Sequence, residues 1–149
     1  MTTPTDPSAG LERLLEAELT AEPVFLMARA ASTGSSAANR RLAELELKVR
    51  HYSVLALACG EEQLTQRELS QFLVLDPSQI VAILDDLERR GAVERRTDPR
   101  DRRSKIIAPT AAGRELYARA RVLVENSTAE SLSPAEREEL SRLLKKVAF

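Results

Sequence analysis

The apolar residues of the N-terminal part of the chain recur at the spacing of helices. A short amphipathic helix ending near Pro23 is predicted by four leucines, Leu11, Leu14, Leu15 and Leu19. A longer helix is predicted from about Pro23 to Leu45, although Gly34 weakens its middle. The stretch from Leu47 to Cys59 predicts a third helix whose apolar residues are too continuous for a surface position. We expect this third helix to form the spine of the core.

The start of the next helix is marked by two kinds of signal. Thr65 can cap the helix, and Glu68 can return a hydrogen bond to the capping residue. Leu64 can also pack against Leu69 across the helix start. This combination of a capping box and a hydrophobic staple predicts a helix that begins directly after Thr65.

The same arrangement recurs eleven residues later. Asp76 can cap a second helix, Pro77 suits its first position, and Gln79 completes a capping box. The helix is predicted to end at residues 89–90, with Gly91 in the left-handed conformation after it. Two short helices joined by a tight turn predict a helix-turn-helix motif, in which the second helix reads the DNA major groove.

The 100° advance per residue separates two faces of this second helix. The core face is predicted to hold Ile80, Ile83, Leu84 and Leu87, and the outer face Ser78, Ala82, Asp85 and Arg89, with Gln79 at the flank. Base contacts come from the N-terminal part of such a helix, so Ser78 and Gln79 are our leading candidates. The further DNA-binding candidates in this motif are Thr65, Gln66, Arg67 and Ala82.

A basic segment follows the helix-turn-helix. Between Arg95 and Lys105 there are six cations and two acids, in a chain whose net charge is only −1. Short β-compatible flanks at 92–94 and 106–108 enclose an Asp98-Pro99 turn, which predicts a two-stranded hairpin with a basic tip. A charge run of this kind is often a solvated, flexible loop. The preceding helix-turn-helix instead favours a wing that contacts phosphates or a narrow minor groove.

Two further helices are predicted after the hairpin. Thr110 to Gly113 can open a long helix that runs to about Ser131, and Ser133 to Glu136 is another capping box. Both helices carry an apolar stripe, as does the helix near Leu11, and the small core cannot cover all of these faces. A two-fold helical dimer interface explains them most simply.

Composition limits the remaining choices of class. The chain has 149 residues, one cysteine and no apolar run long enough for a membrane span, so a cytoplasmic setting is the default expectation. The predicted fold is mainly α, an α+β winged helix with added dimerisation helices. We expect a disordered tail at 1–10, N-terminal dimerisation helices at 11–46, a winged helix-turn-helix domain at 47–109 and C-terminal dimerisation helices at 110–149.

Three segments together resemble the MarR family of bacterial winged-helix regulators. They are residues 87–96 at the end of the recognition helix, residues 98–103 in the wing, and Thr110 with Gly113. The resemblance runs from about Val24 to Val147. It implies a transcriptional regulator, most often a repressor. It also implies a homodimer with a triangular outline, whose two winged-helix lobes dock on the half-sites of a pseudopalindromic DNA duplex.

The resemblance also implies roles for residues of the wing. By family pattern, Asp101 pairs with Arg103 to brace the hairpin, and either Arg100 or Arg102 enters the minor groove. The DNA-binding candidates of the wing are therefore Arg100, Arg102 and Arg103. Asp98 is a second candidate for bracing. An aspartate beside several arginines can orient one of them by a bidentate bond, which agrees with this reading.

The chain departs from the family pattern at several positions. Ala82 and Asp86 stand where relatives often carry basic residues, so shape readout is expected to matter more than base readout. Pro109 replaces a usual leucine, and Glu46 replaces a usual glycine. Both replacements lie at positions where the local backbone matters.

Family members often sense small aromatic or phenolic anions in a cleft beside the DNA-binding lobe. The residues that could fall near such a cleft are Phe25, Met27, Arg29, His51 and Tyr52. A lone histidine in an apolar helix is more often a packing residue than a sensor. The ligand-binding candidates that the resemblance implies are Phe25, Arg29, His51 and Tyr52.

Two alternatives remain beside the DNA-binding regulator. Cys59 would serve a redox-sensing regulator, although its position at the end of an apolar helix favours a buried, inert thiol. The second alternative, a winged helix that docks on RNA or protein, is weakened by the scarcity of aromatic residues. One cysteine and one histidine do not make a zinc site, and no catalytic group is spaced as an enzyme needs. We therefore expect no metal, no cofactor and no enzyme activity.

Overall fold

The computed structural model describes residues 7–125 and 132–149. The chain divides into two compact units, residues 1–36 and residues 37–149. Their division falls inside the long helix α2, Pro23–Leu42. Each unit is described by itself.

The first unit consists of short helical segments. Helix α1 spans Pro7–Leu14, a 3-10 turn follows at Glu18–Ala21, and α2 then begins at Pro23. The predicted amphipathic helix around Leu11 is therefore present, but it starts and ends earlier than its leucines indicated. It also begins inside the segment 1–10 for which we predicted a tail, because proline is well tolerated at the first helical position. The tail prediction for residues 1–6 lies outside the described residues.

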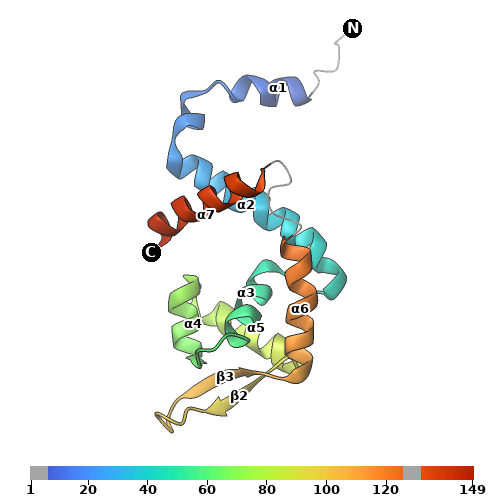
Figure 1. The fold of residues 1–149 in the computed structure, drawn as a ribbon, viewed down its shortest axis with the longest axis vertical. Coiled ribbons are helices and arrows are strands. Elements are labelled where there is room, and N and C mark those ends of the chain that lie inside the picture. Colours follow the sequence, from blue (N-terminus) through green and yellow to red (C-terminus); the bar gives the residue numbers. More distant parts are fainter. Residues whose placement is uncertain (1–6, 126–131) are drawn as a thin grey trace. The chain divides into compact units, whose positions relative to one another are not determined.

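The helices of the second unit match the sequence prediction closely (Figure 1). After α2, a 3-10 turn at Ala43–Leu45 leads to α3 at Val49–Ala58. Helices α4 and α5, Gln66–Leu73 and Pro77–Arg89, form the helix-turn-helix. Both predicted capping boxes are present, on Thr65 with Glu68 and on Asp76 with Gln79. Gly91 has a φ of +68°, which confirms the predicted left-handed residue after α5.

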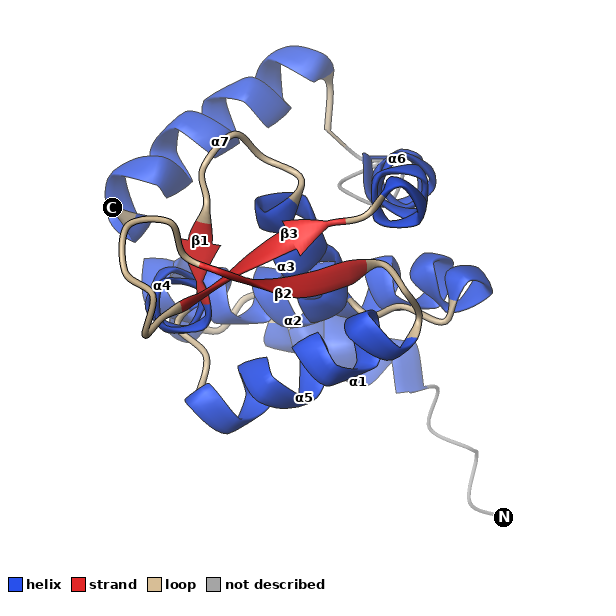
Figure 2. Ribbon diagram, turned by 90° about the horizontal axis from the view of Figure 1, so that it is seen from below, coloured by secondary structure: helices blue, strands red, loops and turns tan. Residues whose placement is uncertain are grey.

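The β-sheet is larger than predicted. Strands β2, Val93–Thr97, and β3, Lys105–Pro109, form the expected hairpin. A third strand, β1 at Leu64–Thr65, pairs antiparallel with β3, so the strand order is β1-β3-β2 (Figure 2). The predicted two-stranded wing is therefore confirmed as β2 and β3. Strand β1 was not predicted, because it is only two residues long and carries no periodic pattern. It joins the helix-turn-helix directly to the wing.

Two helices complete the second unit. Helix α6 spans Ala111–Glu125, and the part predicted to reach Ser131 lies outside the described residues. Helix α7 spans Pro134–Ala148 and starts with the predicted capping box of Ser133 and Glu136. Its residues are largely exposed, so the residues that the structure describes leave the apolar stripe of α7 uncovered.

One hydrophobic cluster links the helices to the sheet. The four predicted core residues of α5 are all buried, which confirms the face assignment of that helix. The largest fully buried side chains are Leu42, Leu47, Val54, Leu55, Leu69, Ile80, Leu84 and Leu87. Residues of β2, β3 and α6 join the same cluster. The wing and the recognition helix are therefore mounted on one packed core.

The linker between α2 and α3 contains Glu46, the residue that replaces a usual glycine of the family pattern. Glu46 has a φ of +54°, a conformation that glycine adopts more easily than any other residue. Arg90 donates from Nη2 to the carbonyl oxygen of Glu46 (2.9 Å) and from Nη1 to that of Leu45 (3.3 Å). The end of the recognition helix thus holds this linker in place.

The Thr110 to Gly113 motif has a direct structural explanation. The Thr110 hydroxyl accepts a hydrogen bond from the Gly113 N–H (3.0 Å) and donates to the carbonyl oxygen of Gly91 (2.5 Å). A Cβ placed on Gly113 would lie 1.9 Å from the carbonyl oxygen of Ala92. The start of α6 therefore packs against the segment after α5 so closely that only glycine fits.

Candidate nucleic-acid interface

The helix-turn-helix is held by hydrogen bonds across its turn. The Leu75 N–H donates to the Ser70 carbonyl (3.1 Å), and the Ser70 hydroxyl donates to the Leu75 carbonyl (2.7 Å). Val74 has a φ of +52° in this turn and is 89% exposed. These contacts fix the angle at which α5 leaves α4.

The candidate base-reading residues are exposed at the start of α5. The Ser78 hydroxyl donates to Asp76 Oδ1 (2.5 Å), which leaves its oxygen lone pairs available as acceptors. The Gln79 side-chain oxygen accepts from the Asp76 N–H (3.3 Å), so its amide nitrogen remains available as a donor. Ala82 lies on the same helix, one turn further on, and is also exposed. The start of α5 thus presents a small donor and acceptor surface.

The candidates at the start of α4 differ in what they can offer. The Thr65 hydroxyl donates to Glu68 Oε2 (2.8 Å) and accepts from the Glu68 N–H (3.2 Å), so it is already used in capping. Gln66 is half-buried, whereas Arg67 is exposed. Of these three, only Arg67 presents a charge that is suited to a phosphate.

The acidic residues of α5 are paired with arginines. Arg95 on β2 donates from Nη2 to Asp85 Oδ1 (2.6 Å) and from Nη1 to Glu88. Asp86 accepts from Arg89 (2.8 Å) and forms an ion pair with Arg90 (2.8 Å). The negative charge that would repel a phosphate from this helix is therefore locally balanced.

The base of the wing tip is organised around Asp98. Its side chain is buried and accepts from the backbone N–H of Arg100 (2.8 Å) and from that residue's Nε and Nη2 (both 3.1 Å). Arg100 Nη2 also donates to the carbonyl oxygen of Gln63 (3.1 Å). The hydrogen bonds from Arg100 lower the pKa of the Asp98 carboxyl and keep it ionised. Arg100 is thus occupied in joining the wing to the loop before β1.

The structure pairs the other wing acid differently from the family pattern. Asp101 accepts from the backbone N–H of Arg103 (3.0 Å) and from the Ser104 hydroxyl (3.2 Å). Within the described residues, it forms no bond with the Arg103 guanidinium, so the predicted side-chain pair is absent. The reason is the tight turn, in which the Ser104 N–H donates to the Asp101 carbonyl (2.9 Å). This turn brings the Arg103 N–H and the Ser104 hydroxyl to the carboxylate.

Two arginines remain available at the tip. The side chains of Arg102 and Arg103 are exposed, and neither has a hydrogen bond or ion pair with any described residue. Arg96 is bound to Glu94 (2.6 Å), and Lys105 donates to the Thr97 hydroxyl (3.0 Å) while keeping its full charge. The six cations of the segment therefore divide into three with a carboxylate partner and three without one.

The predicted ligand residues fall in different units of the chain. Phe25 and Arg29 line a cavity of about 230 Å³ in the first unit, together with the leucines around α1. Tyr52 lies on α3 in the second unit and packs on Tyr117, with ring centroids 5.8 Å apart. His51 Nε2 lies 3.6 Å from Asp86 Oδ2, and His51 Nδ1 has no hydrogen-bond partner among the described residues. The four predicted ligand residues are therefore divided between the two units, and neither unit contains a site formed by all four.

The remaining candidate chemistry is sparse. Burial raises the pKa of the Cys59 thiol, which disfavours the reactive thiolate. Across residues 7–125 and 132–149, the structure contains no cluster of three metal-binding side chains and no helix that could cross a membrane.

Comparison with known proteins identifies the family. A sequence model of the MarR family matches residues 45–104. The solved structure of a MarR-family transcriptional regulator from Rhodococcus sp. RHA1 is 37% identical, with a TM-score of 0.82 over 90% of this chain and 96% of that one. The chain therefore belongs to the MarR family of winged-helix transcriptional regulators.

Three further relatives have informative names. CouR from Rhodococcus jostii RHA1, solved with p-coumaroyl-CoA, is 38% identical over 90% of this chain and 96% of that one, with a TM-score of 0.78. The repressor CouR on a 23-mer DNA duplex matches at 31% identity over 89% and 96% of the two chains, with a TM-score of 0.80. A protein of Thauera aromatica named for regulation of the hcr operon is 32% identical over 99 residues, or 64% of this chain. That match spans 60% of the Thauera protein.

Proposed function

We propose that the chain is a homodimeric repressor that binds a pseudopalindromic DNA duplex and is released by a small molecule. The observation that carries this proposal is the exposed, unpaired Arg102 and Arg103 at the tip of a wing whose other arginines are engaged. A wing of this kind beside a helix-turn-helix suits a duplex, because the recognition helix fits the major groove and the wing reaches the adjacent minor groove.

We assign roles to the wing residues according to whether their side chains already have a carboxylate partner. Arg102 enters the minor groove, and Arg103 and Lys105 contact phosphates. Arg100 and Asp98 hold the tip in position, and Asp101 shapes its turn. This assignment is supported by the buried Asp98, whose three bonds from Arg100 leave that arginine with little freedom to reach DNA.

Base readout by α5 is expected to be limited. Ser78 and Gln79 are placed to contact base edges, and Gln79 can present its amide nitrogen to an acceptor. Ala82 can offer only an apolar contact, such as one with a thymine methyl group. Arg67, Thr65 and Gln66 at the start of α4 would face the DNA backbone. Groove shape and phosphate contacts therefore supply much of the specificity.

Two sets of exposed apolar residues support a dimer. The first lies in the N-terminal unit and comprises Leu11, Leu14, Leu15, Leu19, Val24 and Leu26. The second lies on α7 and comprises Leu140, Leu143, Leu144 and Val147. Exposed apolar surface of this extent is unusual for a monomer. Burying both sets against a second copy would give two lobes spaced for two half-sites.

The last part of the proposal is release from DNA by a small aromatic or phenolic ligand. Two relatives that carry the name CouR support this part: one, at 38% identity, has been solved with p-coumaroyl-CoA, and another, at 31% identity, has been solved with DNA. The residues first proposed for a phenolic ligand are Phe25, Arg29, His51 and Tyr52. Phe25 and Arg29 share a cavity, which supports their inclusion more than that of the other two.

The test is a mobility shift with duplex fragments that tile the region upstream of the protein's own gene. We expect one fragment to bind below micromolar concentration, with an affinity that falls steeply with salt. Sedimentation equilibrium of the same preparation should give twice the chain mass. Equal, weak binding to every fragment would contradict a sequence-specific repressor, and a monomer that binds tightly would contradict the dimer.

A further inference from the structure

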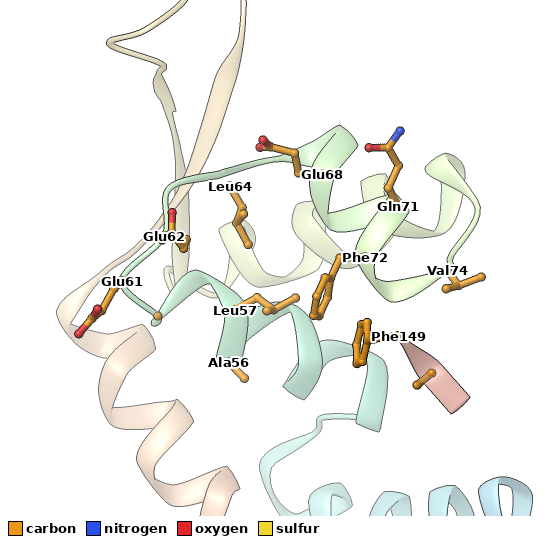
Figure 3. A pocket seen from close by; sticks show the side chains of 12 residues that line it. Ala56, Leu57, Glu61, Glu62, Leu64, Glu68, Gln71, Phe72, Val74 and Phe149 are labelled. Atoms are coloured by element: carbon orange, nitrogen blue, oxygen red, sulfur yellow. The ribbon is translucent and has the colours of Figure 1, made fainter. Parts of the chain in front are cut away.

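A large cavity opens beside the helix-turn-helix, apart from the residues discussed for DNA binding. It has a volume of about 760 Å³, within the range of small-molecule sites. Its walls come from α3, the loop after α3, β1, α4 with the turn that follows it, and the C-terminal end of α7 (Figure 3). None of the four residues first proposed for a ligand lines it.

The inner wall of the cavity is apolar and partly aromatic. Phe72 of α4 and the C-terminal Phe149 stack with ring centroids 5.6 Å apart. Leu57 and Leu64 lie beside them, and all four side chains are seen around the opening in Figure 3. Phe72 is 54% exposed and Phe149 87%, so both rings keep a large open surface. Such a wall suits a planar aromatic molecule.

The charged residues of the lining are all acidic. They are Glu61, Glu62 and Glu68, and no lysine, arginine or histidine is among the lining residues. Glu68 is held at the rim by its capping bonds from Thr65 (2.7 and 2.8 Å), which also lower the pKa of its carboxyl. Hydrogen bonds to Asp98 hold the guanidinium of Arg100 and raise its pKa most, and the charges of Glu68 and Glu62 contribute to the same rise.

We propose that this cavity is a binding site for a planar aromatic cation. The apolar wall would take the aromatic body of the ligand, the open phenylalanine rings would attract its positive charge, and the carboxylates would balance that charge at the rim. An aromatic carboxylate of similar size would be repelled by the same three acids. The site therefore selects the charge opposite to that of a phenolic acid.

The position of the cavity gives the ligand a route to the DNA-binding surface. Phe72 lies on the first helix of the helix-turn-helix, and Phe149 ends the helix that we propose for dimerisation. A ligand that contacts both rings would tie the movement of α4 to that of α7. This regulatory consequence rests on the proposed function, whereas the binding site itself does not.

The test is a titration without DNA, using berberine, a fluorescent planar aromatic cation, and 1-anilinonaphthalene-8-sulfonate, a fluorescent aromatic anion. We expect berberine to bind saturably to the full chain. The double variant Glu61→Gln, Glu62→Gln should weaken berberine binding about fivefold or more, and Phe149→Ala should weaken it about threefold or more. Neutralising the two glutamates should leave binding of the anion unchanged or make it tighter.

The matched control is Glu115→Gln, which removes an exposed carboxylate of α6 that does not line the cavity. It should leave the berberine affinity unchanged, and thermal melting should show that every variant is folded. The proposal is overturned if berberine does not saturate, if the double glutamine variant binds it as the wild type does, or if the control weakens binding equally. Since no DNA is present, these outcomes do not depend on whether the chain is a repressor.

Discussion

Arg100 holds the buried carboxylate of Asp98 through its backbone N–H and two atoms of its guanidinium, at 2.8 to 3.1 Å. The first arginine of the basic tip is thereby committed to the protein itself. Its Nη2 also reaches the Gln63 carbonyl in the loop before β1, so the wing is tied to the segment that leads into α4. The tip is a braced turn that projects its next two arginines outward.

Removing this brace should loosen the tip without unfolding the domain. In Asp98→Asn, the ion pair with Arg100 is lost, and the amide hydrogens of Asp98 and Arg100 should exchange about tenfold faster or more. DNA affinity should also fall, because the loosened tip of the variant loses more conformational entropy on binding than the ordered wild-type tip does. Hydrogen exchange measured by NMR checks the first effect, and a mobility shift checks the second. Unchanged exchange at both amides would contradict the brace.

The same brace should respond to acid. The pKa of the Asp98 carboxyl is lowered in the folded protein. The stabilising effect of Asp98 is therefore fully present above the ordinary aspartate pKa of about 3.9, and it is lost as the pH falls through the lower pKa of the folded state. Asp101→Asn serves as the control, since Asp101 bonds to backbone and serine donors of the turn and not to a guanidinium.

Arg95 should support DNA binding without touching DNA. It balances Asp85 and Glu88 on the recognition helix, so Arg95→Ala should leave two uncompensated acids near the phosphates and weaken binding about three- to tenfold. Adding Asp85→Asn and Glu88→Gln should restore most of that loss. A mobility shift of the single and triple variants makes the comparison, and a triple variant as weak as the single one would contradict this role.

Two glycines provide a matched test of close packing. A Cβ at Gly113 would meet the Ala92 carbonyl at 1.9 Å, so Gly113→Ala should lower the free energy of unfolding by about 2–4 kcal/mol. Gly34 lies in a helix with nothing within 4 Å of such a Cβ, so Gly34→Ala should stabilise by about 0.5–1 kcal/mol. Urea unfolding measures both. Equal effects of the two substitutions would refute the packing argument for Thr110 and Gly113.

His51, the only histidine, should make stability depend on pH. Burial lowers its pKa, with Asp86 opposing this effect and Arg90 and Lys48 adding to it. As the pH falls below the ordinary value of about 6.5, the unfolded chain takes up a proton before the folded one does, so stability should fall. His51→Asn should flatten that decline, and Asp86→Asn should lower the pKa of His51 further. NMR titration of the imidazole measures the pKa, and a value above 6.5 would contradict this account.

The helices could be predicted from the sequence because their ends carry local signals. Each of three helices starts with a capping residue and, three positions later, an acid or amide that returns the hydrogen bond. These capping residues are Thr65, Asp76 and Ser133. Sequence spacing alone was therefore enough to predict where these helices start. Helix α1 was misplaced because Pro7 was read as part of a tail rather than as a first helical residue.

The wing contacts could not be predicted in the same way. The pairing of Arg100 with Asp98 and the approach of Gly113 to Ala92 depend on how distant segments pack, and a charge pattern does not contain that information. The family resemblance suggested a side-chain pair of Asp101 and Arg103, whereas the turn geometry gives Asp101 the Arg103 backbone N–H and the Ser104 hydroxyl. The short strand β1 was missed for a related reason, since two residues define no period.

The central claim is that Arg102 and Arg103 carry the contact with DNA. The most direct measurement is a salt series of mobility shifts on the bound upstream fragment, comparing the wild type with Arg102→Ala, Arg103→Ala and the control Arg119→Ala on the exposed side of α6. In a dimer, each wing substitution removes two charges, so the slope of log affinity against log salt should become shallower by roughly two units, with affinity lower by about tenfold or more. The control should change neither quantity. Wing variants that keep the wild-type slope and affinity would contradict the account.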